Sequence, residues 1–292
     1  MKSLKARRIL SNVLIYVILS IMCIIWLLPL VWIILQSFGA SVSARANIIP
    51  KTWADCGGFG NYVKLFNPNA EGPLRGMFIK WFGNTLIVAI LTCLISTLFV
   101  LGTAYGLSRF RFKGRSLFMK INLVIGMFPG FLGMIILYWV MKEIFHLQGT
   151  YWSLVIIYSA GAGGGYYISK GFFDTISKSI DEAAEIDGAN KAQIFFQIIL
   201  PLAKPIVIYT ILTSFMAPWG EYVTASYIIG VNVSNWTVPM GLYNMMSNNT
   251  YMVTYYTQFC AGAVVVAIPI TILFFVLQKY YVSGVTGGAV KG

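Results

Sequence analysis

The stretch from Phe82 to Leu107 reads FGNTLIVAILTCLISTLFVLGTAYGL and contains no charged residue. An α-helix needs about 20 mostly apolar residues to cross the hydrocarbon core of a bilayer. This stretch is long enough and apolar enough to do so. It therefore predicts a membrane-spanning helix and indicates a membrane protein.

The composition of the whole chain supports a protein that crosses the membrane several times. Of the 292 residues, 58% are hydrophobic and 10% are charged, and the mean hydropathy is +0.76. A soluble domain typically has about 25% charged residues, and so few charges cannot cover a water-facing surface of this size. The abundance of apolar residues also excludes a disordered chain. The net charge of +12 is typical of basic cytoplasmic loops and does not indicate nucleic-acid binding.

Six apolar segments predict membrane-spanning helices. They are residues 9–35, 82–107, 118–141, 152–168, 205–230 and 259–280. With the N-terminus in the cytoplasm, the inside segments hold 15 of the 21 Lys and Arg residues and the outside segments hold 6. Because cytoplasmic segments are enriched in Lys and Arg, both termini are predicted to be cytoplasmic.

The predicted organisation is a single membrane domain with short ends. Residues 1–8 form the cytoplasmic N-terminus, 9–281 the six-helix transmembrane domain, and 282–292 the cytoplasmic tail. The domain contains a cytoplasmic loop, 169–204, and an extracytoplasmic loop, 231–258.

No enzymatic or metal chemistry is predicted. The four cysteines show no disulfide or metal spacing, and His146 is the only histidine, so the sequence offers no metal site and no catalytic residues. The phosphate-binding pattern G-x-x-x-x-G-K-[ST] is absent from the sequence. The chain is therefore not expected to be an enzyme or to hydrolyse ATP.

The loop 169–204 is too polar to span the membrane but carries signals for two short helices. Ser179 and Glu182 have the spacing of a capping box, which predicts that a helix begins at Ser179. Gly188 can end this helix in the left-handed conformation. The first helix would be small and acidic, and such a helix can enter a groove on another protein.

The second helix of this loop is predicted from Asn190 onwards. Asn190 can act as its N-cap, with Gln193 three residues later, and the helix is predicted to end before Pro201. The result is a cytoplasmic helix–turn–helix. An amphipathic segment that lies on the membrane without a partner protein is the alternative.

The residues of this loop resemble the EAA loop of ATP-binding-cassette (ABC) import permeases. The matching residues are Glu182-Ala183-Ala184, Asp187-Gly188-Ala189 and Leu200-Pro201. The chain is similar to binding-protein-dependent ABC importer permeases of the carbohydrate type, most closely to the smaller permease subunit of maltose/maltodextrin importers. Further matching stretches are 104–105, 108–114, 127–129, 170–176, 269–272 and the tail 282–292.

The resemblance implies the all-α type I ABC importer permease fold, with six transmembrane helices in a bacterial cytoplasmic membrane. It implies ATP-driven import of maltose and maltooligosaccharides delivered by an extracytoplasmic sugar-binding protein. The implied protein partners are also a second, larger permease subunit and two ATPase subunits. ATP and Mg²⁺ would bind to those ATPase subunits, and this chain would hold no cofactor.

The resemblance also implies roles for individual residues. The residues expected to couple to the ATPase are Glu182, Ala183, Ala184, Asp187, Gly188 and Pro201. Those of the tail expected to contact the ATPase are Gly287, Gly288 and Lys291. Those expected to contact the binding protein are Asn248, Asn249, Thr250 and Tyr251.

Glu221 and its neighbour Trp219 are candidates for the translocation path. Glu221 lies within the fifth predicted span, about 24 Å from Pro205 at 1.5 Å per residue. A carboxylate inside a span is a functional candidate, and the alternative is an interfacial acid that is paired locally. Pro218 and Gly220 can break the helix at this point.

Three alternatives remain open. The imported sugar can be another oligosaccharide, such as a fructo- or galacto-oligosaccharide. An ion-coupled secondary transporter or channel would need several charged residues deep inside its spans, and Glu221 is the only charged residue of a predicted span that lies away from the span's ends. A membrane scaffold without transport activity would leave the loop and the tail unexplained.

Overall fold

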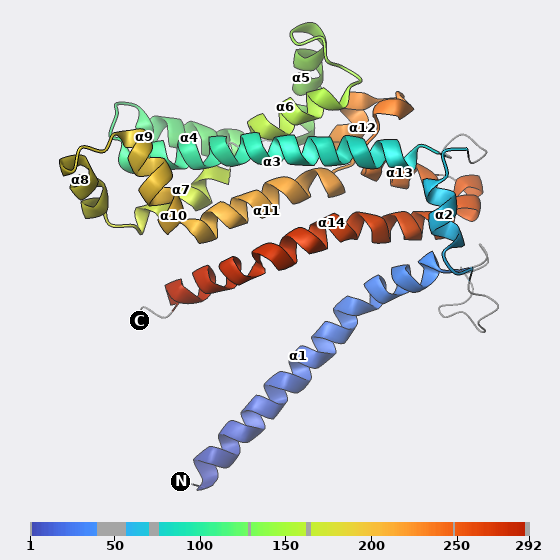
Figure 1. Cartoon of the computed structure of the whole chain (residues 1–292), viewed down its shortest axis with the longest axis horizontal. Helices are drawn as coiled ribbons and strands as arrows, with labels where there is room; N and C mark the ends of the chain where they lie inside the picture. The colour runs from blue at the N-terminus through green and yellow to red at the C-terminus, as the bar shows by residue number, and fades with distance from the viewer. Residues whose placement is uncertain are drawn as a thin grey trace. The chain divides into compact units, whose positions relative to one another are not determined.

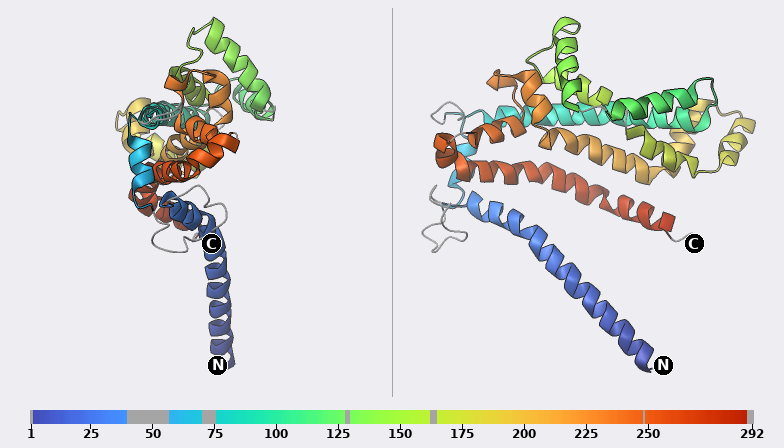
Figure 2. Two further views of the ribbon diagram at one scale, coloured as in Figure 1. Left: turned by 90° about the vertical axis from the view of Figure 1, so that its right-hand side faces the viewer. Right: turned by 180° about the vertical axis from the view of Figure 1, so that it is seen from behind.

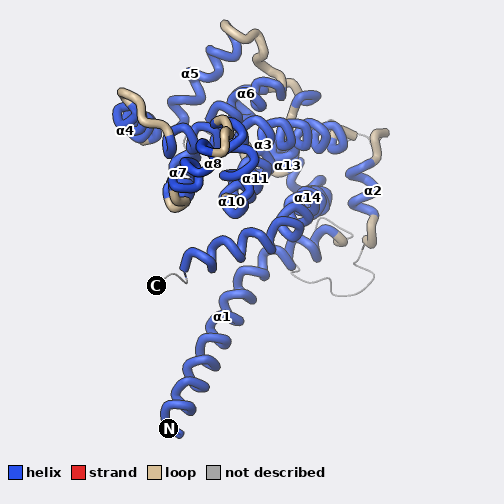
Figure 3. The backbone as a smooth tube through the Cα atoms, turned by 60° about the vertical axis from the view of Figure 1, so that its left-hand side comes forward, coloured by secondary structure: helices blue, strands red, loops and turns tan. Residues whose placement is uncertain are grey.

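The computed structural model describes residues 2–39, 57–69, 76–127, 130–161, 165–247 and 249–289. Within these ranges the chain forms helices and loops and no β-strand (Figure 3), which confirms the all-α prediction. The chain divides into two compact units, Met1–Gly76 with Asn244–Val265, and Met77–Tyr243 with Val266–Gly292. Each unit is described here by itself.

The first unit contains α1 (Lys2–Ser37), α2 (Gly60–Phe66) and the start of α14 (Asn249–Ala289). Asn61 of α2 is 7% exposed and joins the three segments. Its Nδ2 donates to the carbonyl oxygens of Ser37 and Gly39, both at 2.9 Å, and its Oδ1 accepts from Thr257 Oγ1 at 3.0 Å. One amide thus satisfies two backbone carbonyls that are left free at the end of a helix.

The second unit is built around α3 (Phe78–Arg109), which packs along α6 (Tyr151–Gly161), α7 (Tyr166–Asp174) and α11 (Lys204–Gly220). The short helices α7 to α10 gather at the end of α3 where Arg109 lies, and α13 (Val238–Met245) lies at the other end (Figures 1 and 2). The other helices of this unit are α4 (Arg115–Gly126), α5 (Gly130–Glu143) and α12 (Val223–Ile229).

The segment 231–258, expected as a loop, is largely helical. It contains a 3₁₀ turn (Val233–Asn235), α13 and the first residues of α14. The start of α3 holds the part of this segment that belongs to the second unit. Trp81 Nε1 donates to the carbonyl oxygen of Val233 at 2.9 Å, and Thr85 Oγ1 accepts from the backbone N–H of Val238 at 2.8 Å. Both Trp81 and Thr85 are fully buried.

Three of the six predicted spans coincide with single helices that are long and apolar enough to cross a membrane. These are Ile9–Ser37, Phe78–Arg109 and Thr254–Lys279. A fourth is possible if the bent pair Lys191–Leu202 and Lys204–Gly220 counts as one span. Six spans and the cytoplasmic position of both termini stay predictions.

Two of the other predicted spans, the third and the fifth, are interrupted within the described residues. The third is divided between α4, which ends at Gly126, and α5, which begins at Gly130, and Pro129 lies outside the described residues. The fifth is divided at Glu221 and Tyr222, directly after Gly220. Since Pro218 and Gly220 both weaken the helix at this point, the predicted break is confirmed.

Candidate functional site

The first helix of the predicted helix–turn–helix is α8 (Lys178–Ile186), and its N-cap is Ser177. Ser177 Oγ accepts from the backbone N–H of Ser179 at 3.3 Å. The prediction that Ser179 and Glu182 form the capping box was wrong, because the N-cap is Ser177, two residues earlier. The signal was ambiguous, since serines at positions 177 and 179 can both serve as an N-cap.

Gly188 ends α8 as predicted. It has a φ of 86°, in the left-handed region that favours glycine. The backbone N–H of Gly188 donates to the Glu185 carbonyl at 3.0 Å, and that of Ala189 to the Ala184 carbonyl at 2.9 Å. This pair of bonds is a Schellman motif, which satisfies two carbonyls at the helix end and turns the chain towards the next helix.

The second helix begins with the predicted capping box of Asn190 and Gln193. It continues through α9 (Lys191–Gln193), a π-helical turn (Ile194–Ile199) and α10 (Leu200–Leu202). The prediction that it ends before Pro201 was wrong. Pro201 lies near the end of this continuous helical run, just after the π-helical turn, and the break comes two residues later at Ala203, where the chain bends by 88° into α11.

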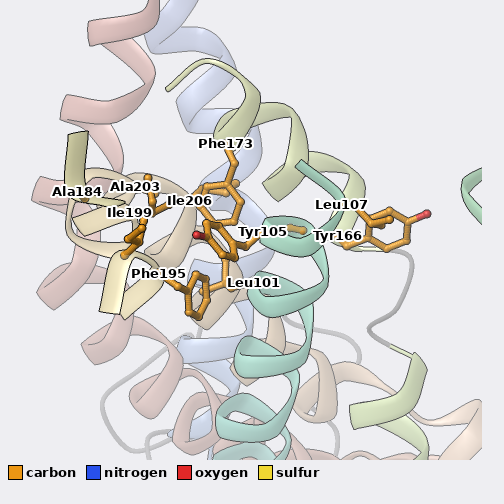
Figure 4. Close-up of a cluster of buried hydrophobic side chains, with 12 residues drawn as sticks. Leu101, Tyr105, Leu107, Tyr166, Phe173, Ala184, Phe195, Ile199, Ala203 and Ile206 are labelled. Carbon is orange, nitrogen blue, oxygen red and sulfur yellow. The ribbon is translucent and has the colours of Figure 1, made fainter. Parts of the chain in front are cut away.

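Apolar packing fixes the helix–turn–helix to the end of α3. Tyr105 of α3 lies among the rings of Phe173 and Phe195, with ring-centroid distances of 6.4 and 4.9 Å (Figure 4). Ala184 of α8, which is 7% exposed, and Ile199, which is fully buried, belong to the same cluster. A hydrophobic cluster of the second unit is thus shared between α3 and the predicted coupling loop.

Polar contacts complete this attachment. Ser108 Oγ donates to Asp174 Oδ1 at 2.6 Å, and Lys170 Nζ donates to Asp174 Oδ2 at 2.5 Å. Burial raises the pKa of Asp174, but the hydrogen bonds from Lys170 and Ser108 and the charges of Lys170 and Arg115 outweigh it and leave that pKa below its usual value. Asp174 is therefore held ionised at the end of α7.

Sequence reasoning missed Arg109 and Asp181, which form an ion pair between α3 and α8. Both lie in stretches that were already singled out, 108–114 and the acidic start of the coupling loop. The sequence did offer one signal for this pair. Arg109 is a basic residue just after a predicted span, and the chain has only nine acidic residues that could pair with it.

The predicted coupling residues divide between the core and the surface. Glu182, Ala183, Asp187 and Gly188 are exposed, whereas Ala184 is buried. Pro201, which is also exposed, lies on the second helix. The neighbouring Ile186 is 87% exposed. The side of α8 that does not pack on α3 therefore presents carboxylates beside an exposed aliphatic side chain, a combination suited to a protein partner.

Glu221 lies at the break between α11 and α12 and is paired locally. Its carboxylate accepts from Tyr158 Oη at 2.7 Å and from the backbone N–H groups of Thr224 and Ala225 at 2.9 and 3.1 Å. It also lines a cavity of about 560 Å³ between the helices of the second unit. Trp219 is 4% exposed and packs on Phe82, away from the lining of this cavity.

The structure does not describe the side chains of the remaining predicted site residues. Asn248 and Lys291 lie outside the described residues. The others belong to α14 through their backbone alone. They are Asn249, Thr250, Tyr251, Gly287 and Gly288.

The long apolar helices indicate a membrane protein, the helix–turn–helix presents an exposed surface suited to a protein partner, and comparison with known proteins gives the family. Residues 99–287 match the family described as binding-protein-dependent transport system inner membrane component, and the chain belongs to it. The galactooligosaccharides transport system permease protein GanQ of Bacillus subtilis (strain 168) is 37% identical over 99% of both chains. The maltodextrin transport system permease protein MdxG of the same organism is 32% identical over 98% of both chains.

A solved structure has the same fold. It is a bacterial ABC transporter involved in the import of the acidic polysaccharide alginate, with a TM-score of 0.72 and 24% identity over 93% of this chain and 96% of that chain. The resemblance stated from the sequence is confirmed. The chain is a multi-pass permease subunit of a sugar ABC importer, which works with a substrate-binding protein and other ABC subunits. Family membership removes the ion-coupled transporter and the scaffold as alternatives.

Proposed function

We propose that this chain is the smaller permease subunit of an importer for maltose and maltooligosaccharides in the bacterial cytoplasmic membrane. Two ATPase subunits close on ATP and Mg²⁺, which they alone bind, and this chain and a larger permease subunit change from inward-facing to outward-facing. Alternating access then follows from the different affinity of the ATPase dimer for the two states.

The observation that carries the coupling part of the proposal is the geometry of α8. Ala184 and Asp181 anchor this helix in the core, and Glu182, Ala183 and Asp187 remain exposed. We assign to the exposed residues, with Gly188 and Pro201, the contact with the ATPase. Of the tail, Gly287, Gly288 and Lys291 are proposed to reach the ATPase dimer. Residues 248–251 are proposed to contact the binding protein, and Glu221, with Trp219 beside it, to border the translocation path.

Maltooligosaccharides are the proposed substrate because relatives from maltodextrin systems match the chain over its full length. Galacto-oligosaccharides are the second candidate, favoured by the 37% identity to GanQ. A transporter that recognises one glycosidic linkage rejects the other when its polar groups are left unpaired by the wrong sugar.

The substrate is tested by uptake in a strain that lacks this chain. We expect the deletion strain to lose accumulation of labelled maltotriose while glucose uptake persists. Labelled galactotriose is measured in parallel. Normal maltotriose accumulation, in a strain without a second such importer, contradicts the maltodextrin assignment, and a selective loss of galactotriose uptake supports the second candidate.

The topology is tested by thiol labelling of intact cells in a background without native cysteines. Val63 of α2, 66% exposed, is predicted to face the outside, so Val63→Cys should react with an impermeant reagent. Lys113→Cys, at an exposed position after α3, should react only after permeabilisation. Labelling of Lys113→Cys in intact cells contradicts the assignment. Val63 is preferred to its neighbour Asn61, which lies on the same helix but is buried and would not react.

A further inference from the structure

Arg109, the last residue of α3, forms an ion pair with Asp181 of α8 that is buried on both sides. Arg109 Nε lies 3.1 Å from Asp181 Oδ2, and the two side chains are only 5% and 10% exposed. Arg109 Nη2 also donates to the carbonyl oxygen of Ile176 at 3.0 Å. By contrast, each of the ion pairs Lys142–Glu143, Lys170–Asp174 and Lys191–Glu185 has at least one side chain that is more than a third exposed.

A buried ion pair contributes little to net stability, because the cost of removing two charges from water offsets most of their attraction. It does penalise separation of the partners, since each would then be a buried charge without a counter-ion. The pair between Arg109 and Asp181 therefore fixes where the start of α8 lies relative to the end of α3.

Asp181 connects the ion pair to the exposed surface of α8. Asp181 directly precedes Glu182, so a residue anchored on α3 and a residue exposed to a partner occupy the same turn. Earlier in the chain, before α8, Ser108 of α3 donates a hydrogen bond to Asp174 at the end of α7. Ser108 and Arg109, consecutive residues of α3, thus hold the chain before and after Ser177, the N-cap of α8.

We propose that Arg109 and Asp181 are positioning residues that transmit movement of α8 to α3. This inference rests on the proposed function, because it takes α8 as the helix that the ATPase moves. The two residues touch neither ATP nor sugar and act only by making α8 and α3 move together. Without the pair, α8 still docks on the ATPase and Ala184 still packs in the core, but the start of α8 is no longer fixed to α3, so most ATP is hydrolysed without sugar transport.

The test uses the complete importer with its binding protein in reconstituted vesicles, and its readout is the number of sugar molecules imported per ATP hydrolysed. Asp181→Asn removes one charge at nearly constant volume, and Arg109→Gln removes the other charge with a shorter, neutral side chain. We expect at least a tenfold fall in sugar imported per ATP, with the ATPase subunits still co-purifying and hydrolysis still stimulated by the binding protein. Asp181→Glu keeps the charge and should recover at least a third of the wild-type ratio.

The matched control is Glu143→Gln. It removes the carboxylate of an exposed ion pair with Lys142, in α5, and should leave the ratio unchanged. Glu182→Lys is measured in parallel to test α8 itself. If Glu182→Lys uncouples the importer and Asp181→Asn does not, the ion-pair inference is wrong and the proposed function stands. If neither uncouples it, α8 is not the ATPase contact.

A purely structural role is the remaining outcome that overturns the inference. In that case Asp181→Asn and Arg109→Gln lower the amount of assembled importer, and the sugar-to-ATP ratio stays at its wild-type value. If both neutral variants fail to assemble, the double variant Arg109→Lys with Asp181→Glu decides, since it keeps both charges and alters the geometry of the contact. A lowered ratio supports the positioning role, and an unchanged ratio contradicts it.

Discussion

Glu182→Lys and Gly188→Leu are each expected to abolish sugar uptake while the protein remains inserted in the membrane. Glu182 is exposed in this chain and would be desolvated against a basic partner in the ATPase groove, where loss of one side of such a pair costs about 2–5 kcal/mol. Gly188 has a positive φ, which costs a residue with a Cβ roughly 1–2 kcal/mol. Leucine at this exposed turn would also hold the docked surfaces apart.

The measurement combines uptake, ATPase activity in reconstituted vesicles and co-purification of the ATPase subunits. Gly188→Ala separates the two effects of leucine, because the space around the Gly188 Cβ position is open within 4 Å in this chain. It should retain more uptake than Gly188→Leu. If Glu182→Lys and Gly188→Leu keep full binding-protein-stimulated hydrolysis and transport, the helix–turn–helix is not the coupling element.

Gly241→Val is expected to prevent the second unit from folding. A Cβ at Gly241 would lie 2.0 Å from ring carbon Cε3 of Trp81, and Trp81 is fully buried and fixed by its hydrogen bond to Val233. Because the ring cannot move without losing that bond and its packing, the cost is that of a severely overpacked core, about 3 kcal/mol or more. The measurements are the amount of protein in the membrane and its melting temperature in detergent.

The control for this prediction is Gly83→Ala. Gly83 lies on α3 two residues after Trp81, and a Cβ there would have no neighbour within 4 Å. Alanine is also a better helix former than glycine by about 1 kcal/mol, so Gly83→Ala should keep or raise the melting temperature. Normal expression and melting of Gly241→Val would mean that α13 does not pack on Trp81.

Sequence reasoning succeeds in this protein where a local chemical rule determines the structure. The left-handed Gly188 and the capping box of Asn190 and Gln193 depend on a few consecutive residues. The break after Gly220 is also local, because it follows from proline and glycine in one turn. Each of these features was predicted at the correct residue.

The features that were missed depend on residues far apart in the sequence. Asp181 pairs with Arg109 and Asp174 with Ser108, and no local pattern indicates which basic or hydroxyl group a carboxylate meets. The helical structure of 231–258 likewise depends on Trp81 and Thr85. The start of α8 was misplaced because two serines compete as N-caps, and tertiary packing decides between them.

The 88° bend at Ala203 sets the second helix of the helix–turn–helix, Lys191–Leu202, at a right angle to α11. The two helices are the short and the long arm of a lever. The long arm, α11, has 17 residues and is roughly 25 Å long at 1.5 Å per residue. Because the arms are perpendicular, a force on the short arm along the direction of α11 exerts a torque at Ala203. It rotates α11 about this residue and does not slide α11 along its axis. A rotation of about 10° at Ala203 then swings the far end of a helix of this length by about 4 Å. That far end carries Glu221, so a small displacement of the short arm would be enlarged at the cavity that Glu221 lines.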